Sequence, residues 1–161
     1  MSIALRGAEP GDLGFVLSNM RSLAAAEGRP GAVTVTVRRL EEMLFGGAPR
    51  ARCLIVERDA EAVGHAWIEE RYSTFTGHKA LYLEDLVIVE SVRGQGVGRR
   101  AMGLLAALAR REGFESMAWS VVDENREVVR FYERLGGRPT GSTPFRLEGA
   151  AYEALAREGR E

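Results

Sequence analysis

A glycine-spaced turn between an apolar segment and an amphipathic one constrains this chain more than any other feature. Leu81–Val89 is apolar and β-branched, which predicts a buried strand. Arg99–Glu112 carries apolar residues at helical spacing, which predicts a helix. Between them, Arg93–Gly98 reads Arg-Gly-Gln-Gly-Val-Gly. A strand, a glycine turn and a helix in this order predict an anion-binding site, because the N–H groups of the turn and the positive end of the helix dipole point at the same place.

The turn departs from two common phosphate-binding motifs. A P-loop requires Gly-Lys-Ser/Thr at the start of the helix, whereas Gly98 is followed by Arg99 and Arg100. A dinucleotide-binding motif requires glycine at position 99. The pattern that remains is R-x-x-G-x-G, formed by Arg93, Gly96 and Gly98. A tight turn in which the glycines serve only the geometry is the alternative.

Composition predicts one globular domain over residues 1–161. With 45% hydrophobic and 28% charged residues, the chain is long enough to bury a core. A formal net charge of −1 gives no reason to expect a nucleic acid as partner. We expect a cytoplasmic protein, since no apolar run approaches a membrane span and no signal-peptide core is seen. Cys53, the one cysteine, is expected to be a buried small hydrophobe, and no metal is expected.

The rest of the chain predicts short strands and helices in a mixed α/β fold. The predicted strands are Ser2–Arg6, Ala51–Glu57, Ala62–Arg71, Ser116–Val122 and Thr143–Leu147. The predicted helices run from Asp12 to about Glu27, over Val37–Phe45, from Asn125 to Leu135 and over Gly149–Glu158. Asp12 and Thr36 are the expected N-caps of the first two helices, and residues 58–61 are the expected turn of a hairpin.

The glycine turn resembles the acetyl-CoA pyrophosphate loop of the GNAT N-acetyltransferase superfamily. A second motif strengthens the resemblance: Asn125 and Tyr132 are seven residues apart, so they share a helix face, as in the superfamily's N-x(6)-Y helix. Phe131 to Gly136 is similar to its F-Y-x-x-x-G ending. The resemblance implies a mostly antiparallel central sheet, splayed at the cofactor site and flanked by helices. An N-cap role for Asn125 and a core role for Tyr132 are the alternatives.

Acetyl transfer to an amine needs a base and is helped by an acid. A primary amine has a pKa of about 10, so only about one molecule in a thousand is neutral at pH 7. The candidate acid is Tyr132, which would protonate the departing thiolate, and the candidate base is Glu84. Because strand neighbours point to opposite faces, Glu84 and Asp85 are not expected to serve one site together. Pairing with an arginine is the alternative for both carboxylates.

The resemblance narrows to the diamine N-acetyltransferase branch, which includes spermidine/spermine N-acetyltransferase. It is carried by Tyr82–Leu86, by Arg93–Gly96 and by Phe145–Ala156, which follows the branch pattern F-R-x-x-G-x-A-x-x-x-L-A, and so covers most of the chain. It implies that Glu84 takes the amine proton through water and that Tyr132 is the general acid. The implied cofactor-binding residues are Leu86, Val87, Ile88, Arg93, Gly94, Gln95, Gly96, Val97, Gly98, Arg99, Asn125, Arg126, Glu127 and Val128. The implied substrate-side residues are Glu27, Glu84 and Ser120.

By this resemblance the chain transfers acetyl from acetyl-CoA to a primary amine of a small molecule, by direct attack in a ternary complex. The implied acceptor is a polyamine, a diamine or a lysine-like amino acid, and the implied assembly is a homodimer. Glu124 and Gly141–Pro144 depart from tryptophan-containing branch motifs, which bears on the acceptor. Glu69 and Glu70 either line the mouth of the site or form a solvated strand end. Acetylation of a protein N-terminus or lysine, and a catalytically silent acyl-CoA sensor, are the alternative functions.

Overall fold

The computed structural model describes residues 1–121 and 125–159. The chain divides into two compact units, Met1–Val122 and Asp123–Glu161. The first unit is built on a five-stranded sheet in which the strands lie in chain order, β1 to β5. The second unit contains only helices and connecting segments among its described residues. The candidate site residues therefore fall into two groups, one in each unit.

Four antiparallel strands and one parallel strand make the sheet. The antiparallel strands are β1 (Ile3–Gly7), β2 (Ala51–Arg58), β3 (Glu61–Tyr72) and β4 (Lys79–Ile88). The fifth, β5 (Ser116–Trp119), pairs with β4 in parallel. It is shorter than predicted, and Val122, its predicted end, lies outside the described residues. The mixed, mostly antiparallel sheet is the one that the sequence predicts.

The hairpin predicted between β2 and β3 is confirmed. Its two central residues, Asp59 and Ala60, both have positive φ, 49° and 69°. A two-residue turn with two positive φ angles matches the right-handed twist of the strands that it joins. The turn pairs Arg58 with Glu61, and a register shift between Val56 and Glu57 then brings Cys53 opposite Trp67.

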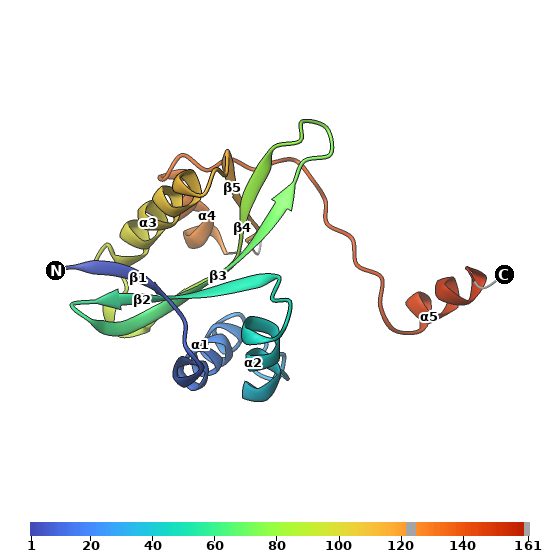
Figure 1. Cartoon of the computed structure of the whole chain (residues 1–161), viewed down its shortest axis with the longest axis horizontal. Helices are drawn as coiled ribbons and strands as arrows, with labels where there is room; N and C mark the ends of the chain where they lie inside the picture. Colours follow the sequence, from blue (N-terminus) through green and yellow to red (C-terminus); the bar gives the residue numbers. More distant parts are fainter. Residues whose placement is uncertain (122–124, 160–161) are drawn as a thin grey trace. The chain divides into compact units, whose positions relative to one another are not determined.

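Helices cover both faces of the sheet (Figure 1). On one face, α1 (Leu13–Ala26) and α2 (Val37–Phe45) enclose a core with Cys53, Ile55 and Trp67, and Thr36 caps α2 through a 3.2 Å bond from the Arg39 N–H. On the other face, α3 (Val97–Arg111) buries Val97 and Ala101 against Val56 and Val63. Helix α3 begins two residues before its predicted start, because Gly96, not Gly98, precedes its first turn.

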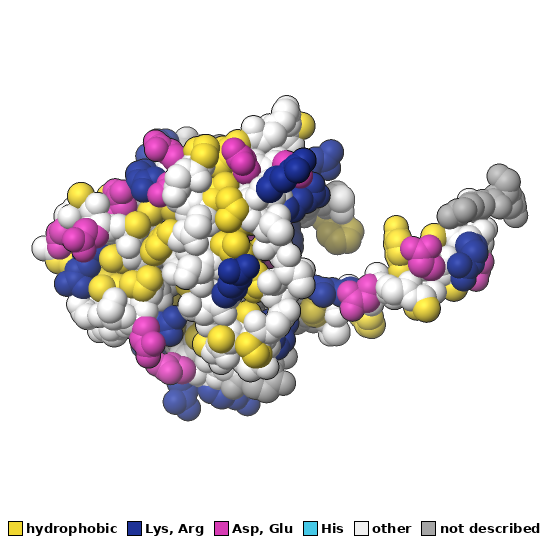
Figure 2. Space-filling view, turned by 90° about the horizontal axis from the view of Figure 1, so that it is seen from below, with side chains coloured by type: hydrophobic (Ala, Val, Ile, Leu, Met, Phe, Trp, Pro, Cys, Tyr) yellow, Lys and Arg dark blue, Asp and Glu magenta, His cyan; other side chains and the backbone are white. Residues whose placement is uncertain are grey.

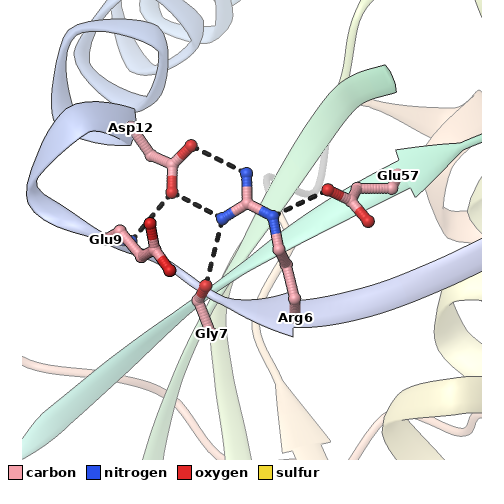
Figure 3. A network of polar contacts seen from close by, with 5 residues as sticks. All are labelled: Arg6, Gly7, Glu9, Asp12 and Glu57. Atoms are coloured by element: carbon pink, nitrogen blue, oxygen red, sulfur yellow. Dashed lines mark hydrogen bonds and ion pairs between the residues drawn. The ribbon is translucent and has the colours of Figure 1, made fainter. Parts of the chain in front are cut away.

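Arg6 ties the first strand to the start of α1 (Figure 3). Its guanidinium donates two hydrogen bonds to Asp12, of 2.6 and 2.9 Å, and one of 2.7 Å to Glu57 on β2. Asp12 also accepts from the Glu9 N–H at 2.8 Å. Asp12 stands at the predicted N-cap position, directly before α1, but its side chain makes no capping hydrogen bond to that helix, because its carboxylate accepts from Arg6 and from the Glu9 N–H. The hydrogen bonds from Arg6 hold the pKa of Asp12 below its usual value.

The second unit contains α4 (Arg126–Glu133) and α5 (Gly149–Glu158). Helix α4 ends two residues before its predicted end, ahead of Gly136, which has φ of 92°. The strand predicted over Thr143–Leu147 is wrong, because this segment is exposed and non-regular. A strand requires a neighbour to hydrogen bond with, and Pro144 removes one of the donors that such pairing would use.

The Arg6 network predicts a pH-dependent contribution to stability. Asp12→Asn removes a partly buried charge pair, so we expect it to lower the free energy of unfolding at pH 7 by about 1 kcal/mol. Because the pKa of Asp12 is lower in the folded state, this contribution is present above pH 3.8 and is lost as the pH falls through the folded value. Urea denaturation between pH 2 and 7 measures it, with exposed Glu41→Gln as control. An equal difference between Asp12→Asn and wild type at every pH would contradict this account.

Candidate active site

The β4 edge opens where β5 ends. Within the described residues, the parallel pairing of β4 with β5 stops at Leu83 and Trp119, although β4 continues to Ile88. A hydrogen bond of 2.9 Å from the Val89 N–H to the Val63 carbonyl fixes the phase of the β3–β4 ladder. Since backbone groups alternate in direction, those of Val87 point to β3, and those of Leu86 and Ile88 point to the open side. Three backbone contacts to the cofactor are predicted from the sequence, at Leu86, Val87 and Ile88. Of these, Leu86 and Ile88 direct their backbone groups to the open side of β4.

The glycine loop follows the open edge. Gly94 and Gly96 have φ of 73° and 81°, a region in which a residue with a Cβ is strained. Gly96 immediately precedes α3, and no hydrogen bond from the N–H groups of residues 94–99 is found among the described residues. These free donors lie at the positive end of a 15-residue helix dipole. The loop is thus able to bind an anion through its backbone.

Two side chains of the loop form hydrogen bonds that hold it against its neighbours. Arg93 donates from Nε to the Ile88 carbonyl at 2.9 Å, so it links the loop to the open edge of β4. Gln95 donates to the Ser91 carbonyl at 3.1 Å and accepts from Arg58 at 2.6 Å. Arg99 is exposed in the first turn of α3. Loop residues 93–98 and the edge of β4 therefore form one continuous polar surface.

Glu84 occupies a bulge in β4. Trp67 pairs with Asp85 and Ile68 pairs with Leu83, so Glu84 is an extra residue without a partner on β3. A bulge breaks the alternation of side chains along a strand. The prediction that Glu84 and Asp85 point to opposite faces of β4, which assumes strict alternation, therefore does not hold here. The pKa of the Asp85 carboxyl is raised by burial first, and then by the negative charges of Glu84 and Glu27. Three carboxylates from α1 and β4 thus share one electrostatic environment.

Glu84 faces an arginine that the sequence did not single out. Its carboxylate, 52% exposed, lies 4.0 Å from Nη2 of Arg71. Arg71 stacks on Tyr82, with Cζ 3.1 Å from the ring centroid, and the Tyr82 hydroxyl lies 2.8 Å from the Ser120 hydroxyl. This brings two predicted substrate-side residues, Glu84 and Ser120, to one cluster. The cluster depends on the β3–β4 register, which the bulge shifts by one residue, so sequence spacing alone could not find it.

Two other acidic residues of the first unit, Glu27 and Glu70, form ion pairs with neighbouring basic residues. Glu27, at the end of α1, pairs with Arg29 at 2.5 Å and is within the electrostatic range of Asp85. Glu70 accepts from the Tyr72 hydroxyl at 2.5 Å and pairs with Lys79 at 3.5 Å. Among the described residues, no group of three His, Cys, Asp or Glu side chains is arranged to hold a metal ion.

The second group of predicted residues lies on α4. Asn125 accepts a hydrogen bond of 3.2 Å from the Val128 N–H, which is the N-cap arrangement. Tyr132 is half-buried, and its ring meets Phe131 edge-on at 5.0 Å between centroids. Arg126 and Glu127 are exposed in the first turn of the helix. The capping role accounts for one oxygen of Asn125 and leaves its amide nitrogen for another partner.

A cleft of about 910 Å³ is lined by Glu69 and Glu70 of β3, but not by Glu84 or the glycine loop. The end of α2, the edge of β2 and the C-terminal end of α3 also line it, through Phe45, Arg52, Glu112 and Phe114. Helix α3 spans about 22 Å, so the cleft and the glycine loop are at opposite ends of it. The predicted cofactor-binding residues of the first unit instead lie along the unpaired part of the β4 edge and in the glycine loop.

The charges of the first unit are mixed. Figure 2 shows acidic and basic side chains interspersed with apolar patches on the face seen from below, with no extended field of one sign. In the part of the chain that the structure describes, no helix is both long enough and apolar enough to cross a membrane.

Comparison with known proteins identifies relatives. Residues 18–137 match the model of the Acetyltransferase (GNAT) family. The chain is 32% identical to a thialysine N-epsilon-acetyltransferase of Sus scrofa, over 96% of this chain and 98% of the relative. It is 31% identical to a spermidine/spermine N(1)-acetyltransferase-like protein 1 of Homo sapiens, over 82% of this chain and 20% of that protein. An integron cassette protein from the mobile metagenome of V. cholerae has a similar fold, with a TM-score of 0.76, 19% identity, and coverage of 98% and 99%.

Two glycines in this region predict opposite effects of the same substitution. Gly96→Ala places a Cβ at φ of 81° and is expected to lower the free energy of unfolding by about 1 kcal/mol. Gly103→Ala, in the interior of α3 with open space around its Cβ, is expected to raise it by up to about 1 kcal/mol. Urea denaturation of the two variants measures the difference. Equal effects of the same sign would show that the loop does not require a left-handed residue at position 96.

Proposed function

The chain belongs to the Acetyltransferase (GNAT) family and is an N-acetyltransferase, and from this we propose that it transfers acetyl from acetyl-CoA to a primary amine of a small molecule. The observation that carries the proposal is the open edge of β4, which leads from Glu84 to Ile88 and is followed, after the 3₁₀ turn Glu90–Val92, by the glycine loop. The relatives named for thialysine and for spermidine/spermine support an acceptor with an aliphatic amine.

The residues of the open β4 edge and the glycine loop fit the parts of acetyl-CoA. The free N–H groups of residues 94–99 suit the pyrophosphate, which needs donors and positive potential. The amides of Leu86 and Ile88 suit the amides of the pantetheine arm, which can pair with a strand edge. Acetyl-CoA would supply the acetyl thioester. Arg93 holds the edge and the loop together through the Ile88 carbonyl.

In the proposed reaction the amine attacks the thioester carbonyl carbon directly. Glu84 accepts the proton that the ammonium group must lose, through a water molecule. The carbon–nitrogen bond forms, the carbon–sulfur bond breaks, and Tyr132 protonates the departing sulfur. The nitrogen gives up a second proton as it becomes an amide, and this proton restores Tyr132 through solvent, so that the products are the amide, the free thiol and the proton taken by Glu84. The carboxylates Glu27, Glu84 and Asp85 attract a cationic acceptor, because their charges act on one region.

The proposal extends to the organisation of the protein. The family match crosses from the first unit into the second, which supports one GNAT domain over residues 1–161. The second unit exposes Phe145, Leu147, Tyr152 and Leu155, with Phe145 95% exposed. Apolar side chains in such numbers are expected to be covered, and we include a homodimer in the proposal. We also retain a cytoplasmic location.

The test measures thiol release from acetyl-CoA with spermidine, putrescine, L-lysine, thialysine and short peptides. We expect turnover with a small amine, and Tyr132→Phe to lower kcat by about 100-fold while acetyl-CoA still binds, because only the proton donor is lost. Turnover with peptides alone would move the protein to the protein-acetylating enzymes. Tight acetyl-CoA binding without turnover would favour an acyl-CoA sensor, and unchanged kcat in Tyr132→Phe would remove Tyr132 as the acid.

Glu84→Gln tests the base. An amide cannot accept the proton, so the loss of kcat/KM should be largest at low pH, where the acceptor is almost entirely protonated, and should shrink as the pH approaches the pKa of the amine. The pH–rate profile from pH 6 to 10 measures it, with Glu41→Gln as the control. A profile of unchanged shape would exclude Glu84 as the base.

A further inference from the structure

Arg71 is a half-exposed cation beside Glu84, the candidate base. Its guanidinium lies beside Glu84, on a strand next to the one that carries Asp85. A site that selects amines only by negative charge would have no use for a positive charge beside its candidate base. Arg71 is also held in place, because it stacks on the ring of Tyr82, whose hydroxyl meets that of Ser120 at 2.8 Å.

The stacking leaves the donors of Arg71 available. Contact with an aromatic ring uses the face of the guanidinium, and its five N–H groups lie in the plane. Among the described residues, no acceptor hydrogen bonds to these N–H groups, and the carboxylate of Glu84, at 4.0 Å, is beyond hydrogen-bonding distance. A planar set of oriented, unused donors is the arrangement that binds a carboxylate in a bidentate manner.

We infer that Arg71 is a specificity-determining residue that binds the carboxylate of an amino acid acceptor, while Glu84 receives its side-chain amine. This rests on the proposed function and narrows its substrate class to α-amino acids with a terminal aliphatic amine. Such an acceptor converts one loose ion pair, Arg71 with Glu84, into two hydrogen-bonded pairs. A diamine or polyamine brings a second positive charge toward Arg71 and is disfavoured.

A comparison of three acceptors with the same aliphatic amine chain shows how the carboxylate affects kcat/KM. L-lysine carries it, L-lysinamide replaces it with a neutral amide, and cadaverine lacks it. We expect the wild-type enzyme to show the highest kcat/KM for L-lysine. Arg71→Gln is expected to lower kcat/KM for L-lysine by about tenfold, a modest figure because Arg71 is half exposed, and to act through KM. The values for L-lysinamide and cadaverine should stay constant or rise.

Two further variants separate recognition from structure. Arg71→Lys keeps the charge but loses the planar donors, so it should recover part of the preference for L-lysine. Arg38→Gln, which changes an exposed side chain of α2, should leave all three values unchanged. An equal loss for all three acceptors in Arg71→Gln, or a wild-type preference for cadaverine, would overturn the inference.

Calorimetry keeps the inference testable if turnover fails. Titration of L-lysine and cadaverine into wild type and Arg71→Gln compares their affinities without a reaction. Tighter binding of L-lysine that disappears in Arg71→Gln would uphold the role of Arg71 even if no acetyl transfer occurs. Equal affinities in the two proteins would reject it, whatever the outcome for the proposed function.

Discussion

The separation of β5 from β4 is the constraint on which the rest of the candidate site depends. Backbone N–H and C=O groups need partners, and a strand that loses its neighbour halfway along presents a row of them to solvent or to a ligand. β4 loses β5 after Leu83, while β3 holds its other edge as far as Ile88. The strand is therefore rigid on one side and open on the other. The glycine loop continues this edge, and Arg93 fastens the loop to the Ile88 carbonyl, so the donors of loop and strand form one surface.

Charge in the first unit is organised by the bulge at Glu84. Without the bulge, Asp85 and Glu84 would point to opposite faces. With it, Glu84, Asp85 and Glu27 influence one another, and the pKa of the half-buried Asp85 is raised. The same one-residue shift sets the register of Arg71 against Ala80, beside the Tyr82 ring. The positions of the acidic residues Glu84 and Asp85 and of the basic residue Arg71 thus all depend on the bulge. The regular strands around it, with Ile55 and Ile68 fully buried, stabilise that irregularity by packing.

Sequence patterns predicted the parts of the fold that local rules govern. The spacing of apolar residues predicted α2 at its observed bounds, and residue type predicted Thr36 as its cap. Two strand-like segments separated by a short turn predicted the hairpin at Asp59 and Ala60. Features that depend on pairing were missed. The sequence of β4 alone does not show that Glu84 is the extra residue of the bulge, because a bulge is defined by the pairing with the neighbouring strand. Thr143–Leu147 has the composition of a strand, but it pairs with no segment among the described residues of its unit. Asp12 stands at the N-cap position of α1, but its carboxylate accepts hydrogen bonds from Arg6 instead of capping the helix.

Several irregular features of the first unit lie between Leu83 and Gly96: the end of β5 pairing, the bulge at Glu84, and two glycines with positive φ. Others lie outside this stretch, in a register shift between Val56 and Glu57 and in the turn at Asp59 and Ala60. Each irregularity costs stability, and such costs are retained where geometry serves a purpose that packing does not. Between Leu83 and Gly96 each one exposes a polar group: a strand amide, a carboxylate or a loop N–H. The core on both faces of the sheet, which includes Leu13, Trp67 and Ala101, provides the stability that this stretch gives up.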